Sequence, residues 1–338
     1  MITTKEFKMS FLQRSTARND TFFAGCFLIL TVTTIGSEAA AKGAIGKDAW
    51  EPLAKLTTQF DKIPGRALKS LNAAARCVQT MQKQKQQLQV YEALRNDAEL
   101  SRVIRPVIAA LTAKQAELIK SLTNLNSAGI RATAQTAFSH GHLAEFFKVF
   151  NGAVNGGTDY CLSTANGGSG GSKASITAGA IAGVAVSTQQ TSFAESADEP
   201  TTIDSTGYKE LTTNNGMDDG KLSTSGTGCL LTVHGASELA GSGNLGGQVP
   251  YAAGHLAMAN AGTTGTRQLS GLSSADRTAT QPIDKASPLL QAWQGLMALQ
   301  DSPHYQPATC DEPTLTDIQN VSEFNAAIKK YVLGDNKP

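Results

Sequence analysis

The chain is poor in the residues that build most active sites and most large β-cores. Only 6% of its 338 residues are aromatic, and 29 basic residues nearly balance 28 acidic residues. This balance gives no electrostatic basis for binding nucleic acid or an anionic membrane surface. The zinc signatures HExxH and CxxC are absent from the sequence. We therefore expect no enzyme activity, no metal site and no cofactor.

The motifs that come nearest to a binding site are weak. His140 and His142 are two residues apart, so on a helix they would face different directions, and we expect both to be solvent-exposed rather than metal-bound. The segment Gly43–Lys47 is too short for a phosphate-binding loop. Gly167–Ser172 is typical of a flexible linker rather than an anion cradle.

The N-terminus has the pattern of a secretory signal peptide. Four basic residues precede the apolar run: Lys5, Lys8, Arg14 and Arg18. The run itself, Phe22–Val32, is shorter than the roughly 20 apolar residues of a membrane-spanning helix. Small residues at Ser37 and Ala39 predict cleavage after Ala39, which makes 1–39 the signal peptide and exports the remainder. An uncleaved signal anchor is the alternative.

Removal of the leader would also remove Cys26. Four cysteines would remain: Cys77, Cys161, Cys229 and Cys310. An even number of cysteines in an exported chain favours two disulfides, and four cysteines allow three pairings.

Residues from about 50 to 150 have the spacing of two long helices. In the first helix, apolar residues recur at alternating intervals of four and three: Leu56, Phe60, Ile63, Ala67, Leu71, Ala74, Val78, Met81 and Leu88. This repeat predicts a coiled-coil seam. We expect Pro52 in the first helical turn, one kink at Pro64–Gly65, and a main helix over about 64–97.

The second helix repeats the same rhythm. Its apolar positions are Ile104, Ile108, Leu111, Leu118, Leu122 and Leu125, and Leu143–Phe150 closes it. Gln115 interrupts the stripe, Pro106 is expected in the first turns, and Gly129 and Gly141 are expected to weaken the helix. Two helices of about 40 residues would each be about 60 Å long. A short polar link makes them an antiparallel hairpin, and their length favours an elongated rod over a compact bundle.

The remainder of the chain has two textures. Residues of about 151–280 are rich in Gly, Ser, Thr and Asn and contain short apolar runs at Ala178–Val186 and Thr227–Val233, which predict a loop-rich head with short strands. Residues of about 283–335 return to helical patterns at Ser287–Gln300 and Ser322–Gly334, with the two serines as expected caps. The expected fold is mainly α, a long antiparallel coiled-coil hairpin with a disulfide-stapled head.

One glycosylation motif lies in the exported part. Asn320 begins the sequon Asn-Val-Ser, which predicts an N-glycan. A second sequon at Asn19 lies in the leader and is discounted.

These features, in this order, resemble the A-type N-terminal domain of trypanosome variant surface glycoproteins over roughly residues 42–335. The segments that carry the resemblance are WEPLAKLTTQFDKIPGRAL, GTDYCLS, GAIAGVAV, GTGCLL, AAGHLAMANAG and LLQAWQGLMAL. The resemblance implies a homodimeric, non-catalytic coat antigen at the cell surface, which shields the parasite and varies under attack by host antibodies. The alternative is a receptor subunit on the same scaffold, similar to a transferrin receptor, with an anchored partner subunit and a host serum protein as ligand.

The resemblance also implies the cysteine pairing. The family's head disulfide corresponds to Cys161 and Cys229. A second family disulfide would join the positions that hold Ala54 and Val186 here, so that bond is missing from this chain. Cys77 and Cys310 then remain as a replacement pair, with a buried free thiol at Cys77 as the alternative.

Members of this family also carry a cysteine-rich C-terminal domain and a tail for a GPI anchor. The sequence ends at Pro338 without either feature. The expectation is a truncated gene product, or a natural short relative that would be secreted or would reach the membrane only through an anchor it does not encode.

Overall fold

The computed structural model describes residues 43–154, 158–189, 193–211, 222–223, 229–232, 249–258, 269–278, 287–306, 310 and 313–334. The chain divides into two units, Met1–Ala39 and Ala40–Pro338, and every described residue lies in the second. The expected signal peptide therefore lies outside the described residues.

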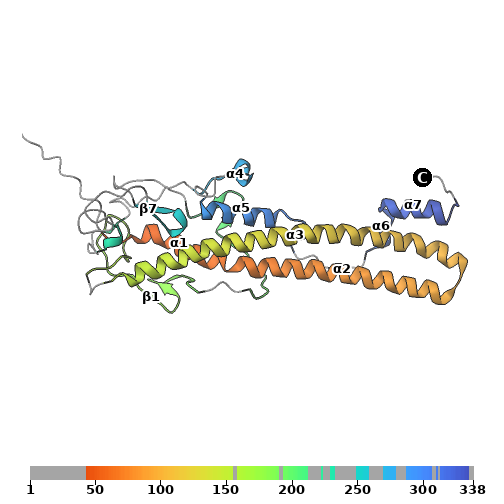
Figure 1. Ribbon diagram of the computed structural model, residues 1–338, viewed down its shortest axis with the longest axis horizontal. Coiled ribbons are helices and arrows are strands. Elements are labelled where there is room, and N and C mark those ends of the chain that lie inside the picture. Colours follow the sequence, from red (N-terminus) through yellow and green to blue (C-terminus); the bar gives the residue numbers. More distant parts are fainter. Residues whose placement is uncertain are drawn as a thin grey trace, which may run out of the picture. The chain divides into compact units, whose positions relative to one another are not determined.

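Two long helices, α2 (Lys62–Arg95) and α3 (Ala98–Gly152), form an antiparallel hairpin (Figure 1). The turn between them needs only two residues. Asn96 ends α2 in the left-handed conformation (φ 45°), and the carboxylate of Asp97 caps α3 by accepting hydrogen bonds from the backbone N–H groups of Glu99 and Leu100. The expected hairpin is confirmed, although α3 is longer than expected.

A polar layer lies within the hairpin at the position where the apolar stripe is interrupted. Gln115 on α3 donates to Gln82 on α2 (2.8 Å) and accepts from Lys85 (2.9 Å). These bonds satisfy the side-chain amide and hold the two helices in one register. Toward the head the apolar stripe is buried, whereas Leu71, Val78, Met81 and Leu88 are only half-buried.

The expected kink at Pro64–Gly65 is wrong, because the helix breaks earlier. Helix α1 (Lys47–Phe60) ends before Asp61, and Pro64 is the third residue of α2. Proline has no N–H for the carbonyl of Phe60, and its ring collides with that carbonyl in a continuous helix, so the interruption falls upstream of the proline.

The expected positions of the other two helical prolines are also wrong. Because α1 begins at Lys47, Pro52 is the sixth residue of the helix and lies beyond its first turn. Likewise α3 begins at Ala98, so Pro106 is the ninth residue of its helix. Both prolines are therefore inside helices, where tertiary packing offsets the lost backbone hydrogen bond.

Gly65 allows another segment of the chain to cross the helix closely. The backbone N–H of Ser196 donates to the carbonyl of Gly65 (3.1 Å), and a Cβ added at Gly65 would overlap the carbonyl oxygen of Ala194. Gly129 lies buried where α2, α3 and α5 meet, next to Ala67 and Leu299. Gly129 has a low helix propensity, as expected, but its lack of a side chain allows the helices to pack closely at this position.

We expect Gly65→Ala to lower the free energy of unfolding by about 1–3 kcal/mol, because the added methyl must displace backbone. Gly141→Ala is the matched control. Gly141 is exposed on α3 with nothing within 4 Å of an added Cβ, so alanine should raise stability by roughly 0.5–1 kcal/mol through helix propensity. Urea unfolding followed by circular dichroism measures both changes, and equal effects would contradict the crossing contact.

Shorter helices lie along the hairpin. Helix α5 (Pro288–Gln300) and helix α7 (Ser322–Tyr331) both pack against α3, and α4 (Ser274–Thr278) and α6 (Leu315–Gln319) are single-turn elements. Leu289, Trp293, Leu296 and Leu299 are buried as expected. Ser287 is the N-cap residue of α5 and Pro288 its first residue, as expected, although the Ser287 side chain makes no cap hydrogen bond. The expected cap at Ser322 is wrong, because Val321 is the cap residue of α7.

The head, defined here as residues 158–278, contains short strands and short 3₁₀ turns. Strands β1 (Ile176–Thr177), β2 (Ala180–Ile181) and β3 (Val184–Ala185) form an antiparallel meander. Two hairpins follow, β4 (Ile203–Asp204) with β5 (Gly207–Tyr208) and β6 (Val249–Tyr251) with β7 (Leu256–Met258). The 3₁₀ turns are η1 (Leu230–Thr232) and η2 (Ala252–Gly254).

The two apolar runs of the head differ from expectation. The run Ala178–Val186 holds two strands instead of one, because Ala182 and Gly183 both have positive φ and reverse the chain between β2 and β3. The run at Thr227–Val233 forms η1 in its described part and no strand. Residues 227, 228 and 233 lie outside the described residues.

Candidate functional site

The disulfide between Cys161 and Cys229 lies at the head end of the hairpin. Their Cα atoms are 5.0 Å apart, and both residues are buried. The segment before α1 holds this region in place, because Ile45 N–H donates to the carbonyl of Cys161 and the Thr232 hydroxyl donates to the carbonyl of Gly43. The disulfide thus fastens two distant loops to the start of the helical scaffold.

A second disulfide joins Cys77 on α2 to Cys310, which follows α5, with a Cα–Cα distance of 5.0 Å. The same segment is held to α2 by Arg66. Its buried guanidinium lies over the Tyr305 ring and donates to Gln306 Oε1 and Glu199 Oε1, each at 2.7 Å. Ser70 also donates to the carbonyl of Tyr305. The structure therefore contains both cysteine pairs that the family resemblance implied.

Asn320 lies on the surface. It is the C-cap residue of α6, it is exposed, and the sequon's Ser322 begins α7. An oligosaccharide attached to its side chain would extend into solvent without displacing any buried residue.

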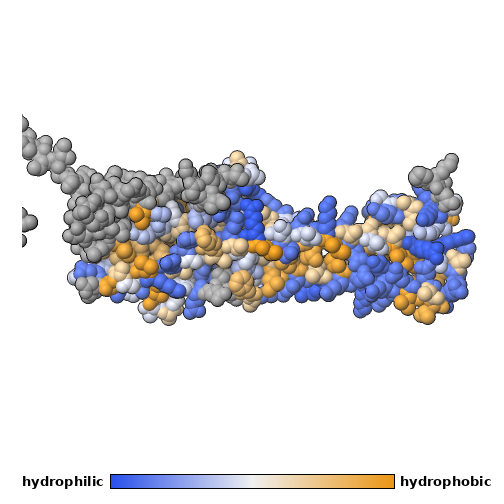
Figure 2. Space-filling model, viewed as in Figure 1, coloured by the Kyte–Doolittle hydropathy of each residue, from blue (hydrophilic) through white to orange (hydrophobic). Residues whose placement is uncertain are grey.

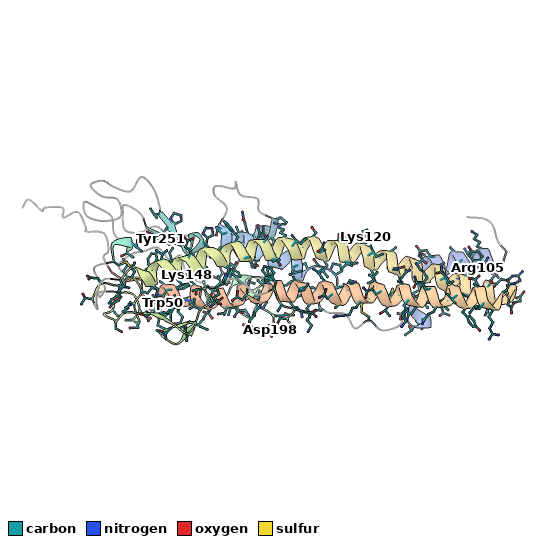
Figure 3. All side chains as sticks on the ribbon, turned by 60° about the horizontal axis from the view of Figure 1, so that its bottom comes forward. Trp50, Arg105, Lys120, Lys148, Asp198 and Tyr251 are labelled. Atoms are coloured by element: carbon teal, nitrogen blue, oxygen red, sulfur yellow. A yellow bond between two sulfur atoms is a disulfide. The ribbon has the colours of Figure 1, made fainter. Side chains whose placement is uncertain are left out.

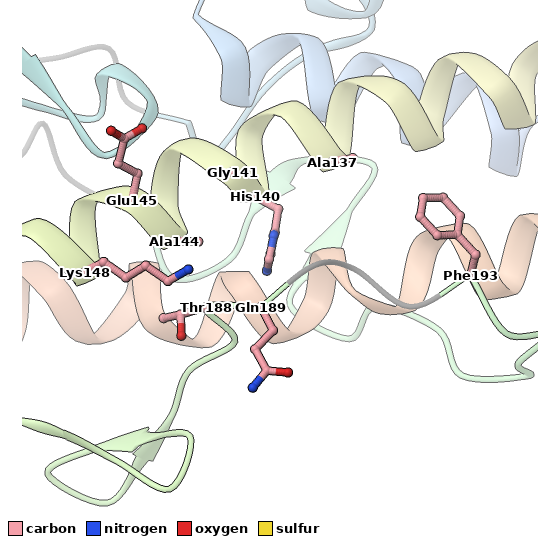
Figure 4. Close-up of a pocket in the computed structure, with 9 residues that line it drawn as sticks. All are labelled: Ala137, His140, Gly141, Ala144, Glu145, Lys148, Thr188, Gln189 and Phe193. Atoms are coloured by element: carbon pink, nitrogen blue, oxygen red, sulfur yellow. The ribbon is translucent and has the colours of Figure 1, made fainter.

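A cavity of about 500 Å³ lies between α3 and the segment that follows β3 (Figure 4). His140 faces it from α3, and the expectation that this residue is solvent-exposed is wrong, because only 3% of it is accessible. His142, two residues on, is exposed and packs edge-on against Phe138. The signal was present in the sequence, because His140 precedes the buried Leu143 and Phe147 by three and seven residues and so shares their helix face.

Polar atoms lie around His140, but some of them lack a hydrogen-bond partner among the described residues. Its Nε2 lies 3.4 Å from Oδ1 of Asp61, the residue at the break between α1 and α2, and neither atom has a hydrogen-bond partner in the described part of the protein. Burial lowers the pKa of His140, and the positive charge of Lys148 acts in the same direction. The Asp61 carboxylate and a hydrogen bond to the Ser187 backbone oppose this shift.

Within the described residues, no group of three or more His, Cys, Asp or Glu side chains is arranged to hold a metal ion. None of the helices described is both long enough and apolar enough to cross a membrane.

Comparison with known proteins decides the family. The model of the A-type trypanosome variant surface glycoprotein family matches residues 26–338. The chain belongs to this family.

Two curated relatives illustrate the similarity. The chain is 31% identical to variant surface glycoprotein MVAT5 of Trypanosoma brucei rhodesiense over 328 residues, which covers 91% of this chain and 60% of the relative. It is 29% identical to variant surface glycoprotein MITAT 1.6 of Trypanosoma brucei brucei over 301 residues, covering 88% and 56%. The chain thus matches a little over half the length of these relatives.

A solved structure supports the fold. The structure of MITat 1.1 superposes with a TM-score of 0.70 over 88% of this chain and 79% of that chain, at 18% identity. At this identity the likeness concerns the fold, and it agrees with the hairpin and head described above.

Ala54 and Val186 occupy the two positions that the family resemblance assigned to a disulfide missing from this chain. Both residues are buried in the same apolar core, where α1 packs against β3. The Thr57 hydroxyl, one turn from Ala54, accepts a hydrogen bond from Ser187 N–H (2.8 Å). Apolar packing and this bond therefore hold the meander to α1 without a disulfide at these positions.

We expect the burial of His255 to make the stability of this family member pH-dependent. Burial lowers the pKa of His255 in the head from 6.5 to about 4. Between these values the unfolded chain binds a proton that the folded chain does not, so stability falls as pH falls. We expect the free energy of unfolding to drop by up to about 3 kcal/mol between about pH 7 and pH 4.

The test is chemical denaturation across this pH range. His255→Gln should flatten the pH dependence, whereas His142→Gln, which replaces an exposed histidine, should leave it unchanged. Equal slopes for the wild type and His255→Gln would contradict this assignment.

Proposed function

We propose that the chain is a surface coat antigen that shields the parasite and mediates antigenic variation. The observation that carries the proposal is that this family member combines a regular helical scaffold with a separate loop-rich region. A long helical hairpin holds most of the regular structure, and a loop-rich head lies at one end (Figures 1 and 3). Trp50 and Tyr251 mark the head end in Figure 3, and Arg105 lies toward the hairpin turn.

The proposed mechanism is physical. Packing of α2, α3 and α5 keeps the scaffold constant, because their facing side chains are buried. Exposed loop residues of the head contribute little to this core, so they can change and alter what host antibodies bind. Close packing of many copies then shields other surface proteins, and no catalytic step is part of the proposal.

We propose that the coat unit is a homodimer joined through the exposed face of α3. Three large apolar side chains on this face remain accessible: Ile119 (47%), Ile130 (62%) and Phe138 (57%). Figure 2 shows apolar patches along the same hairpin on the face that it displays. Burying such side chains against a second copy would be favourable by about 25 cal/mol for each Å² removed from water.

The experiment is the mass of the purified protein by light scattering. The wild type should be a dimer, Ile130→Glu should be a monomer at the same concentration, and the control Gln86→Glu on an exposed part of α2 should remain a dimer. A monomeric wild type would contradict the dimer. Tight capture of one serum protein would overturn the coat function in favour of a receptor subunit.

Export of this antigen would leave two chemical marks. We propose cleavage after Ala39, delivery to the cell surface, and an N-glycan at Asn320. Mass spectrometry of the mature protein should find Ala40 as the N-terminus, and treatment with a peptide N-glycanase should convert Asn320 to aspartate. A mature chain that begins at Met1, or an unmodified Asn320, would contradict the corresponding step.

A further inference from the structure

The cavity beside His140 combines a polar end with an apolar end. At the polar end, Figure 4 shows the side chains of Lys148 and His140 extending from α3 toward the same space. Lys148 is in no ion pair with the described residues, and the buried Nε2 of His140 has no hydrogen-bond partner among them. Thr188 and Gln189 line the facing wall, and the Gln189 amide points away from His140 and Lys148 in Figure 4.

At the apolar end, small side chains leave room. Ala137, Gly141 and Ala144 lie at intervals of four and three on α3, so they share one helix face and form a smooth floor. Phe193, which is 53% exposed, stands at this end of the cavity opposite Lys148 (Figure 4). An aromatic or aliphatic group on this floor would cover apolar surface that is now open to water.

We propose that this cavity binds a small organic carboxylate with a short aromatic or aliphatic tail. The carboxylate lies between Lys148 and His140, and the tail extends over the small residues toward Phe193. The cavity volume of about 500 Å³ is within the usual range for small-molecule sites. Lys148 is the one permanent cation among the lining residues, which matches a monoanion, and Glu145 on the rim points away from the space in Figure 4. The Asp61 carboxylate, 3.4 Å from His140 Nε2, is not among the lining residues.

Binding at this site should be coupled to protonation of His140. The groups that act on the ring are Asp61, the Ser187 backbone and Lys148, and burial keeps the pKa of the free site low. A carboxylate beside the ring favours the imidazolium form, so by linkage the ligand binds more tightly at lower pH. We expect affinity to rise by roughly fivefold or more from about pH 8 to about pH 6.

The test is calorimetric titration of the purified protein with 4-phenylbutyrate. The expected dissociation constant is about 0.1–1 mM, which suits a ligand of this size, and the neutral analogue 4-phenylbutanamide should bind at least about tenfold more weakly. Lys148→Met should weaken binding of the carboxylate by a similar factor. Gly141→Leu should abolish binding, because its side chain fills the floor. The control Lys120→Met, exposed on the same helix, should bind as the wild type does.

Nuclear magnetic resonance of the histidine rings gives an independent readout. Saturating 4-phenylbutyrate should raise the pKa of His140 and leave the ring resonances of the exposed His142 unchanged. Thermal unfolding midpoints establish that each variant is folded. The proposal is overturned by an absence of binding, by equal binding of the amide, by full binding to folded Gly141→Leu, or by an unchanged His140 resonance.

Discussion

Replacing Trp50 with alanine is expected to lower the free energy of unfolding by about 3–5 kcal/mol. Trp50 is fully buried at the start of the scaffold, and its indole Nε1–H donates to the carbonyl of Ser163 (2.8 Å). Backbone hydrogen bonds between Ile45 and Ser163 and between Lys47 and Ala165 run beside it. Loss of the indole would leave a large cavity where α1 meets the disulfide-stapled loop.

Trp50→Phe separates packing from hydrogen bonding. The phenyl ring retains much of the apolar contact but leaves the Ser163 carbonyl without its donor, so we expect a smaller loss of about 1–2 kcal/mol. Tyr91→Ala, at an exposed position on α2, should change stability by less than about 0.5 kcal/mol. Guanidinium unfolding followed by circular dichroism tests the series. Similar values for Trp50→Ala and Tyr91→Ala would show that Trp50 does not join α1 to the head.

Removing the disulfide between Cys77 and Cys310 is expected to lower the free energy of unfolding by about 2–4 kcal/mol. The two cysteines are 233 residues apart in sequence, so the bond restricts a very large loop in the unfolded chain. In the folded protein, the segment that contains Tyr305 and Gln306 would keep its contacts to Arg66, Ser70 and Glu199 but lose its covalent link to α2. Its amide hydrogens should therefore exchange faster in the Cys77→Ser, Cys310→Ser double variant.

The matched control is the Cys161→Ser, Cys229→Ser double variant, in which the bond spans 68 residues. Loop-closure entropy alone predicts a loss smaller by about 1 kcal/mol for this shorter loop. The folded wild-type protein should contain no cysteine that reacts with an alkylating agent after residue 39. Alkylation of Cys77 in the folded protein would contradict the pairing.

Helical periodicity was the most reliable signal in the chain. The four-three spacing from Leu56 to Leu88 predicted a long helix, and the helix is present, because each residue's contribution depends on neighbours within two turns. The position of the break was predicted less well. Pro64 predicted that the helix would be interrupted, but only the structure shows that the interruption lies at Asp61.

The head was predicted only in outline. Its strands are two or three residues long. Elements this short show no repeating pattern of apolar residues, so they cannot be predicted from the sequence. Turns decide their boundaries instead, as Ala182 and Gly183 do between β2 and β3. The exposed position of Asn320 was compatible with its sequon, whereas the burial of His140 was missed because the residue was judged by its neighbour His142 rather than by its helix face.

Features that depend on neighbours in sequence were therefore readable in advance: the helices, the hairpin turn, the polar interruption at Gln115 and the loop-rich texture of the head. Contacts between distant segments were decided by tertiary structure. Gly65 meets Ala194, and the wall of the cavity beside His140 comes from residues after β3. These contacts close loops of tens to hundreds of residues, and their energies depend on how whole helices pack, which no local pattern encodes.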